Sequence, residues 1–203
     1  MATQSLATQL RVKRSEMMIS ELEDVALRLF EKRGFDEVTV DEIASEARIS
    51  ARTFYRYFPA KEDVLQVKIN QRTEALRAAL AARPPHEPPL HSIRLALEEA
   101  VGLEDTTQLR RWTAVVAATP SVLRAVLGGI QMKSQRVLSE FLGARLDMPS
   151  DALVPTMLAA ATDGMIRAAQ TQWFLQGGDL ATKVSDALEV LERGIGADPK
   201  TWS

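Results

Sequence analysis

Cysteine is absent from this 203-residue sequence, and histidine is nearly so. Without cysteine the chain has no disulfide, no zinc site built on thiolates and no thiol nucleophile, a composition that fits a reducing cytoplasm. Its two histidines, His86 and His91, are five positions apart across a proline-rich stretch. Because that spacing does not place both rings on one face of a helix, we expect no metal site and no cofactor.

Long apolar runs are also missing. The apolar run Met157–Ala161 is far too short to cross a bilayer. The segment Met1–Ser20 is polar and basic and contains no apolar core of the kind found in signal peptides. We therefore expect a cytoplasmic protein that neither spans a membrane nor is secreted.

Strand-like alternation is the third feature that the sequence lacks. Apolar residues make up 46% of the chain and charged residues 26%, a balance that argues against disorder and for a packed core. Apolar residues recur with helical period along almost the whole chain. The sequence therefore predicts an all-α fold of about nine helices, near residues 14–32, 40–47, 50–57, 60–82, 90–103, 106–118, 121–146, 150–176 and 179–194.

Two short helices near residue 45 carry clear start signals. Gly34 is suited to end the first long helix. Thr39 and Glu42 have the spacing of a capping box, in which each side chain accepts a hydrogen bond from the other residue's backbone N–H. Ser50 is a second N-cap candidate shortly after the end of this helix. Two short capped helices joined by a tight turn have the proportions of a helix-turn-helix.

The second of these helices has two faces of different chemistry. Phe54 and Phe58 are four residues apart, so we expect both to anchor the helix in the core. The other face carries hydrogen-bond donors and flat side chains, as in a helix that reads the major groove: Ala51, Arg52, Tyr55 and Arg56. The N-termini at Thr39 and Ser50, and that of the helix near Ala60, offer backbone N–H groups to phosphates.

Charge supports this interpretation locally, although the net charge is −2. Between Ala47 and Lys61 there are four basic residues and no acidic one: Arg48, Arg52, Arg56 and Lys61. Such a run taken alone is equally compatible with a solvated surface. Next to two capped helices it favours a surface for nucleic acid.

At this point the sequence resembles a known family. The stretches Gly34-Phe35, Thr39–Ala44, Ile49–Phe58 and Lys61–Leu65 resemble the DNA-binding signature of the TetR (tetracycline-repressor) family, and the match is dense over residues 14–70. The resemblance implies a homodimeric regulator, not an enzyme, that binds double-stranded operator DNA. Its implied domains are a helix-turn-helix domain (1–59), a connecting helix (60–83) and a ligand-binding and dimerisation domain (84–203), with a boundary at the prolines of 84–89.

The resemblance also implies roles for single residues. Phosphates would be held by Thr39, Tyr55 and Lys61, and the DNA backbone is also in reach of Tyr57. Bases or nearby backbone would be faced by Ala51, Arg52, Thr53 and Arg56. Arg48 departs from the pattern, because the family most often has glycine in this turn. We expect a positive φ there, at a cost of about 1 kcal/mol that an added phosphate contact from Arg48 would offset.

Small apolar residues dominate the predicted helix 150–176, which must therefore be covered on more than one face. We expect the last two helices to form a four-helix bundle with those of a second subunit. The predicted interface is Ala161, Gly164, Ala168, Val184, Leu188 and Leu191. The alternative is that these residues belong to the core of a single chain.

Large adaptable side chains in the C-terminal half are candidates for the lining of a ligand pocket, although ordinary core residues have the same pattern. The candidates are Trp112, Met132, Met157, Met165 and Trp173. The stretch from Trp173 to Gly178 resembles the C-terminal domain of mycofactocin-type actinobacterial regulators. That resemblance implies a hydrophobic or acyl-thioester effector.

Two other classes of protein compete with a ligand-released repressor. An enzyme would need a cluster of titratable or metal-binding residues, and the sequence shows none. An architectural DNA-binding protein would need no ligand pocket, so a cavity above about 300 Å³ between the C-terminal helices would favour the regulator. We predict a repressor that a small hydrophobic ligand releases from a palindromic operator.

Overall fold

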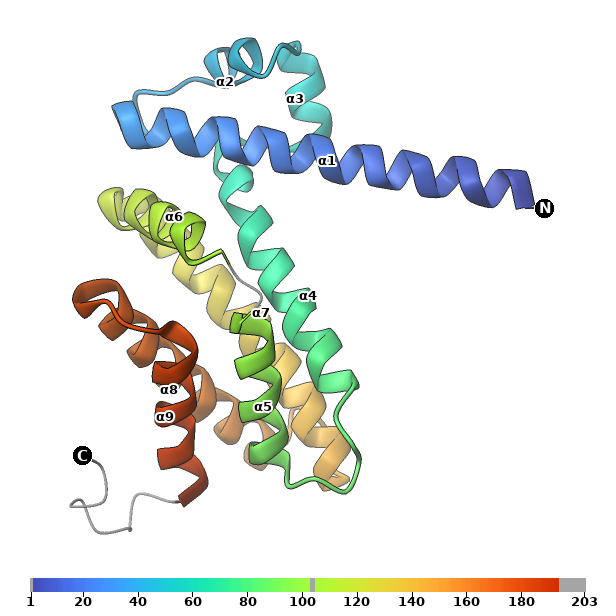
Figure 1. Cartoon of the computed structure of the whole chain (residues 1–203), viewed down its shortest axis with the longest axis vertical. Helices are drawn as coiled ribbons and strands as arrows, with labels where there is room; N and C mark the ends of the chain where they lie inside the picture. Colours follow the sequence, from blue (N-terminus) through green and yellow to red (C-terminus); the bar gives the residue numbers. More distant parts are fainter. Residues whose placement is uncertain (1, 103–104, 194–203) are drawn as a thin grey trace. The chain divides into compact units, whose positions relative to one another are not determined.

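The protein is described by a computed structural model that covers residues 2–102 and 105–193. Every regular element in these ranges is helical, which confirms the predicted all-α fold (Figure 1). The elements in chain order are α1 (Ala2–Arg33), α2 (Val40–Glu46), α3 (Ala51–Tyr57), the 3₁₀ helix η1 (Lys61–Leu65), α4 (Gln66–Ala81), α5 (Pro89–Gly102), α6 (Thr106–Ala118), α7 (Pro120–Leu146), α8 (Leu153–Gln176) and α9 (Leu180–Arg193).

The main difference from the expected boundaries concerns α1, which begins at Ala2 instead of near Arg14. The prediction depended on a buried apolar stripe, and between Thr8 and Met17 no side chain is buried. No glycine or proline interrupts this segment, and good helix formers such as Ala, Gln, Leu and Arg fill it. The helix therefore continues outward from its anchored half.

Two further helices begin later than expected. After Phe58 the chain forms the 3₁₀ helix η1 before α4 starts at Gln66, where one continuous helix was predicted. Ala60 has no hydroxyl to cap a helix, and its backbone N–H instead donates to Asp63 Oδ2 at 2.9 Å. Similarly, α8 starts at Leu153 and not at Ser150, because Ala152 N donates to Pro149 O in a turn (3.0 Å).

The chain divides into two compact units. Unit I consists of Met1–Asn70 and Arg110–Val126, and unit II of Gln71–Leu109 and Leu127–Ser203. Two segments of α6 and α7 thus belong to unit I together with the N-terminal helices. The predicted domain boundaries at residues 59 and 83 stay predictions.

Unit I is held together by a stripe of α1 against the short helices. Leu22, Leu27 and Phe30 of α1 are buried, as are Ile43 of α2 and Phe54 of α3. Gly34, at φ +86°, ends α1 and donates its N–H to Phe30 O at 2.8 Å, as the sequence predicted. This packing fixes the two short helices on the C-terminal half of α1.

The α6 segment contributes two polar ties to unit I. Arg111 donates two hydrogen bonds to the carboxylate of Glu31 on α1, at 2.8 and 2.6 Å. The buried indole of Trp112 donates to Leu65 O at 3.1 Å and so satisfies a carbonyl at the end of η1. Both contacts join residues more than 40 positions apart, so no local sequence pattern announces them.

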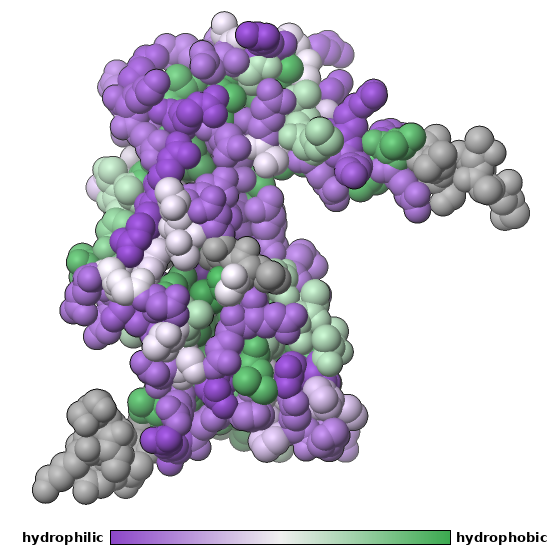
Figure 2. Space-filling model, in the orientation of Figure 1, coloured by the Kyte–Doolittle hydropathy of each residue, from purple (hydrophilic) through white to green (hydrophobic). Residues whose placement is uncertain are grey.

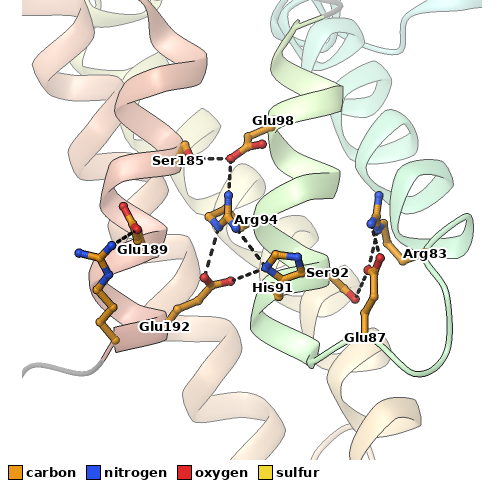
Figure 3. A network of polar contacts seen from close by, with 10 residues as sticks. Arg83, Glu87, His91, Ser92, Arg94, Glu98, Ser185, Glu189 and Glu192 are labelled. Carbon is orange, nitrogen blue, oxygen red and sulfur yellow. Dashed lines mark hydrogen bonds and ion pairs between the residues drawn. The ribbon is translucent and has the colours of Figure 1, made fainter.

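In unit II, α9 packs on both α5 and α8. Val184 and Leu188 of α9 are buried, as are Ile93 and Leu97 of α5. A network of ion pairs borders this contact (Figure 3). Arg94 of α5 donates to Glu98 on its own helix at 2.9 Å and to Glu192 of α9 at 3.3 Å.

The proline-rich loop between α4 and α5 is non-helical from residue 82 to 88. The expected non-helical stretch also included Pro89, but this residue begins α5, because the first position of a helix needs no N–H donor. Arg145 of α7 holds it by donating to three backbone carbonyls: to Pro85 O at 3.0 Å, to Glu87 O at 3.1 Å and to Arg83 O at 3.2 Å. Prolines remove N–H donors from such a loop and leave carbonyls without intrachain partners. A guanidinium with five donors is suited to satisfy them.

Candidate functional site

The first short helix of unit I, α2, has the complete capping box that the sequence predicted. Glu42 N donates to Thr39 Oγ1 at 3.3 Å, and Thr39 N donates to Glu42 Oε2 at 2.8 Å. Arg33 adds an ion pair to the same carboxylate at 2.6 Å. The backbone hydrogen bond from Thr39, followed by the one from Arg33, lowers the pKa of Glu42 to about 2, so the cap stays ionised at neutral pH.

The second short helix, α3, is capped by Ser50. Thr53 N donates to Ser50 Oγ at 3.1 Å, and the two hydroxyls are 2.9 Å apart. Ser50 and Thr53 thus form part of the local cap, and Ala51 between them is half-buried. The N-terminus of α3 is thereby held in one orientation on the surface of unit I.

Arg48 lies in the turn between these helices at φ +56°, as its position predicted. Its N–H donates to Ser45 O at 3.1 Å, and the next residue, Ile49, donates to Ala44 O at 2.9 Å. Arg48 also lines a polar groove of about 660 Å³ together with the carboxylates of Glu21, Asp24 and Glu46. These acidic residues belong to the same unit as Arg48.

The two faces of α3 differ as predicted. Phe54 and Phe58 are buried with their ring centroids 5.4 Å apart. On the other side Tyr55 is 53% exposed, and Arg52 and Arg56 are exposed. The anchoring pair thus turns a tyrosine and two arginines outward.

Tyr57 is half-buried and interacts with its neighbour. Arg56 Nη2 donates to the Tyr57 hydroxyl at 3.3 Å, and the guanidinium carbon lies 5.0 Å from the centre of the Tyr57 ring. Within the described residues, neither Arg52 nor Arg56 has a carboxylate partner. Both guanidinium groups are therefore available to phosphate oxygens or base edges.

Lys61, at the start of η1, has an environment that sequence reasoning did not foresee. Its ammonium donates to Phe35 O at 2.6 Å and to Val38 O at 2.8 Å, and it lies 4.2 Å from the centre of the Phe35 ring. Lys61 thus ties η1 to the loop between α1 and α2. No local sequence pattern announces this contact, because the position of the two carbonyls depends on the tertiary fold.

A buried carboxylate in unit I was also missed. Glu23 of α1 is 2% exposed, and its Oε1 has no hydrogen-bond partner among the described residues. Burial raises the pKa of Glu23 to about 7, against the opposing effect of the positive charge of Lys68. The signal was present in the sequence, because Glu23 lies on the same helical stripe as Ala26, Leu27 and Phe30.

The residues predicted to line a ligand pocket do not share one environment. Trp112 is buried and belongs to unit I, and the other four belong to unit II. Met132 and Met157 are exposed by 74% and 57%, whereas Met165 is half-buried and Trp173 is buried. Their role in a pocket stays a prediction.

Unit II does contain an open surface groove elsewhere. It has a volume of about 500 Å³ and lies between the start of α5 and the end of α9. Its lining is mainly apolar, with one imidazole and one carboxylate: Pro88, Pro89, Leu90, His91 and Glu192. None of these residues was expected from the sequence to line a pocket.

The residues predicted at a dimer interface fall into two groups. Val184 and Leu188 are buried inside unit II, where α9 packs on α5 and α8, and Leu191 is half-buried. Ala161 and Ala168 of α8 are exposed, and Gly164 between them is half-buried. The α9 stripe therefore serves the core of the chain, whereas the α8 residues are open to a partner.

Some kinds of site are not found in the described ranges. No group of three or more His, Asp or Glu side chains in residues 2–102 and 105–193 could hold a metal ion. In the same part of the chain, no helix combines the length and the apolar character needed to cross a membrane.

Comparison with known proteins gives a consistent result for both ends of the chain. Residues 22–67 match the tetR family of bacterial regulatory proteins, and residues 87–196 match the MftR C-terminal domain. The regulator TcmR of Streptomyces glaucescens is 28% identical over 85% of this chain and 82% of its own. MftR of Mycobacterium tuberculosis is 25% identical over 86% of this chain and 89% of its own.

A solved structure agrees with the fold. The transcriptional regulator FadR from Bacillus subtilis, in complex with stearoyl-CoA, superimposes with a TM-score of 0.61 at 21% identity, over 87% of this chain and 98% of its own. The family matches together cover most of the chain, and the capped helix pair lies within the first of them. The chain therefore belongs to the TetR family of helix-turn-helix, DNA-binding transcriptional regulators.

Proposed function

We propose that this regulator is a repressor that binds a palindromic operator as a homodimer and is released by a hydrophobic effector. The observation that carries the DNA-binding part is the geometry of α3. Phe54 and Phe58 anchor one face, and the face that they turn outward holds Arg52 and Arg56 without carboxylate partners in the described chain. Tyr55 lies between the two arginines and is exposed.

The roles within α3 follow from side-chain chemistry. Arg52 and Arg56 are suited to donate two hydrogen bonds each to a guanine edge or to phosphates, and Ala51 and Thr53 lie near enough to the N-terminus of α3 to contact bases. Tyr55 and the exposed cap at Thr39 offer hydroxyls to phosphates. Two-fold symmetry of the protein requires half-sites about one helical turn, or somewhat more, apart.

The test begins with genomic fragments that the purified protein retains, from which an operator duplex is defined. Arg52→Ala and Arg56→Ala should each weaken operator binding by about 1–3 kcal/mol if they read bases. Arg136→Ala removes an exposed arginine from α7 and is the matched control. Equal losses on operator and on random duplex would assign both arginines to phosphates, and a footprint over a single asymmetric half-site would overturn the palindromic operator.

Homodimerisation is supported by the exposed face of α8. Leu153, Met157 and Leu175 are large apolar residues that the isolated chain leaves exposed, and Ala161 and Ala168 are exposed between them. Small residues in the middle of this face allow the backbones of two α8 helices to approach closely. We assign α8 as the main contact and α9 as its intrachain support.

Sedimentation of charged variants tests this interface. Ala161→Glu or Gly164→Glu would bury a carboxylate without a partner and should convert the dimer to a monomer. Ala144→Glu, which places the same charge at an exposed position of α7, is the control and should remain a dimer. If both α8 variants also sediment as dimers, the interface lies elsewhere.

The proposed effector class follows from the ligand of a structurally similar regulator and from the apolar side chains of unit II. The FadR of Bacillus subtilis was solved with stearoyl-CoA, and unit II has both an open, mainly apolar groove and adaptable residues such as Met165 and Trp173. A hydrophobic or acyl-thioester ligand fits such surfaces. Release requires that this ligand bind the DNA-free state more tightly than the DNA-bound state.

Calorimetry with stearoyl-CoA as the probe tests the coupling. Saturating operator should weaken probe binding by about 5–150-fold, and the probe should weaken operator binding by the same factor. Coenzyme A without its acyl chain is the control for the contribution of the headgroup. Equal probe affinities with and without operator would show that this ligand does not control DNA binding.

A further inference from the structure

The first half of α1 stands apart from the core of unit I, because none of its side chains from Thr8 to Met17 is buried. The helix is 32 residues long, about 48 Å at the standard rise per residue, but from Thr8 onward the first fully buried side chain is that of Leu22. All side chains from Thr8 to Arg14 are exposed. Figure 1 shows this half of α1 reaching past α2 and α3. We call residues 2–17 the extension.

The extension is basic. No acidic residue precedes Glu16, whereas Arg11, Lys13 and Arg14 are cationic. In the described part of the chain none of these three has an ion pair. Other arginines of unit I do: Arg33 is paired with Glu42, and Arg111 with Glu31. The extension therefore presents positive charge that its own unit leaves uncompensated.

The cations of the extension lie on two faces. Arg11 and Arg14 are three residues apart and are neighbours on the helix surface, next to the hydroxyl-bearing Thr8 and Ser15. Lys13 projects from the opposite side, near Leu10 and Met17. Only one face thus combines two guanidinium groups with further hydrogen-bond donors, which is the combination that binds phosphates.

We propose that the extension lies along the DNA that flanks each operator half-site and that Arg11 and Arg14 contact its phosphates. This inference rests on the proposed operator binding through α3, which belongs to the same unit. Sixteen helical residues span about 24 Å, the length of about 7 base pairs. Duplex DNA carries one negative charge per about 1.7 Å of its axis, so both guanidinium groups find phosphates along that length.

The salt dependence of DNA binding tests the extension directly. The probe is a fluorescent 40-base-pair duplex of random sequence, titrated at several salt concentrations. Each phosphate contact contributes about 0.9 to the slope of log affinity against log salt, so R11A/R14A should reduce that slope by about 2. Lys13→Ala, from the other face of the same helix, is the matched control and should leave the slope nearly unchanged.

A second measurement uses the selected operator with and without ten flanking base pairs on each side. The wild-type chain should bind the trimmed operator more weakly, and R11A/R14A should bind both duplexes equally. Both substitutions are at exposed positions, so the helical circular dichroism and the melting temperature should not change.

The outcomes separate this proposal from that of operator binding. If the wild-type chain retains no specific fragment, the proposed operator binding fails. If it binds its operator and R11A/R14A has an unchanged salt slope, the extension does not contact DNA and operator reading by α3 stands. If the slope is unchanged and R11A/R14A dimerises more weakly in sedimentation, the extension contacts a second copy of the chain. If the slope is unchanged and binding to anionic vesicles is lost, the extension contacts a membrane surface. Either result would likewise overturn the proposal.

Discussion

The helices α3 and α8 each leave one face uncovered, but the two faces have opposite chemistry. On α3, seven residues long, buried Phe54 and the buried C-cap residue Phe58 support exposed Arg52, Tyr55 and Arg56. On α8, 24 residues long, the exposed side chains include Leu153, Met157 and Leu175. A surface of donors needs a polar partner with fixed geometry, whereas an apolar surface gains free energy from any well-fitting apolar cover. On this comparison we propose DNA for the α3 face and a second subunit for the α8 face. Figure 2 shows one side of the molecule, on which hydrophilic residues prevail and hydrophobic residues form smaller patches.

The anchoring of α3 gives the largest expected effect. Phe54→Ala should destabilise the protein by about 3–5 kcal/mol, because it removes a fully buried ring and leaves a cavity. Tyr55→Ala, at the next and largely exposed position, should change the free energy of unfolding by less than about 0.5 kcal/mol while it weakens DNA binding. Denaturant unfolding measures the stability of both variants. Similar losses of stability in the two variants would remove the distinction between an anchoring and a contacting face.

The two units also differ in how they hold a buried carboxylate. Asp163 of unit II is ion-paired with Arg167, whereas Glu23 Oε1 of unit I has no hydrogen-bond partner in the described chain. Because burial raises the pKa of Glu23 to about 7 from an ordinary 4.5, the folded chain keeps a proton between these pH values that the unfolded chain releases. The stability is therefore full below about pH 4.5 and falls as pH rises through 7.

Glu23→Gln should remove this pH dependence. We expect the variant to be more stable than the wild type by about 2–3 kcal/mol at pH 8 and to lose that advantage near pH 5. Glu21→Gln removes an exposed carboxylate from the same helix and is the control. Unfolding at both pH values measures the difference. A wild-type stability that does not change between pH 5 and 8 would contradict the prediction.

Two glycines of α7 distinguish close packing from open helix surface. A Cβ on Gly143 would lie 2.8 Å from Met148 O and 3.0 Å from Ser150 Cα, whereas one on Gly128 would meet nothing within 4 Å. Gly143→Ala should thus destabilise by about 1–3 kcal/mol, and Gly128→Ala should stabilise by about 0.5–1 kcal/mol. Thermal unfolding of both variants measures the contrast. Equal effects would mean that the turn after α7 moves to accommodate a methyl group.

The smallest expected effect concerns the non-glycine residues with positive φ. Arg48 in unit I has φ +56° and Asp147 in unit II has φ +52°. Aspartate adopts this conformation more readily than arginine, because its short polar side chain bonds to nearby backbone. Arg48→Gly should therefore stabilise by about 1 kcal/mol and Asp147→Gly by less, as melting temperatures would show. A larger gain at Asp147 would contradict this order.

Local sequence patterns predicted α3 and its caps well. The caps at Thr39 and Ser50 and the buried pair Phe54 and Phe58 depend on residues three or four positions apart, and the structure confirms each of them. Even the positive φ of Arg48 was expected from its place in the turn. Such features can be read from sequence because both partners of each interaction are close together along the chain.

Long-range contacts decided the rest. The phosphate contact of Lys61 stays a prediction, but the two carbonyls that its ammonium contacts, those of Phe35 and Val38, lie more than 20 residues earlier in the chain and left no local signal. The apolar stripe of α9 was assigned to a partner, yet Val184 and Leu188 are covered by α5 and α8 of the same chain. Periodicity shows that a face is apolar but not which surface covers it.

The sequence by itself thus determined the helical class, the position and polarity of the capped helix pair, and the side chains that α3 turns outward. Only the tertiary structure decided that α1 extends well beyond its buried half, that Glu23 Oε1 is buried with no hydrogen-bond partner in the described chain, and that α8 has an uncovered apolar face. The physical reason is the range of the interactions. Capping and amphipathic period act within one or two helical turns, whereas burial and desolvation depend on every element that the fold brings near.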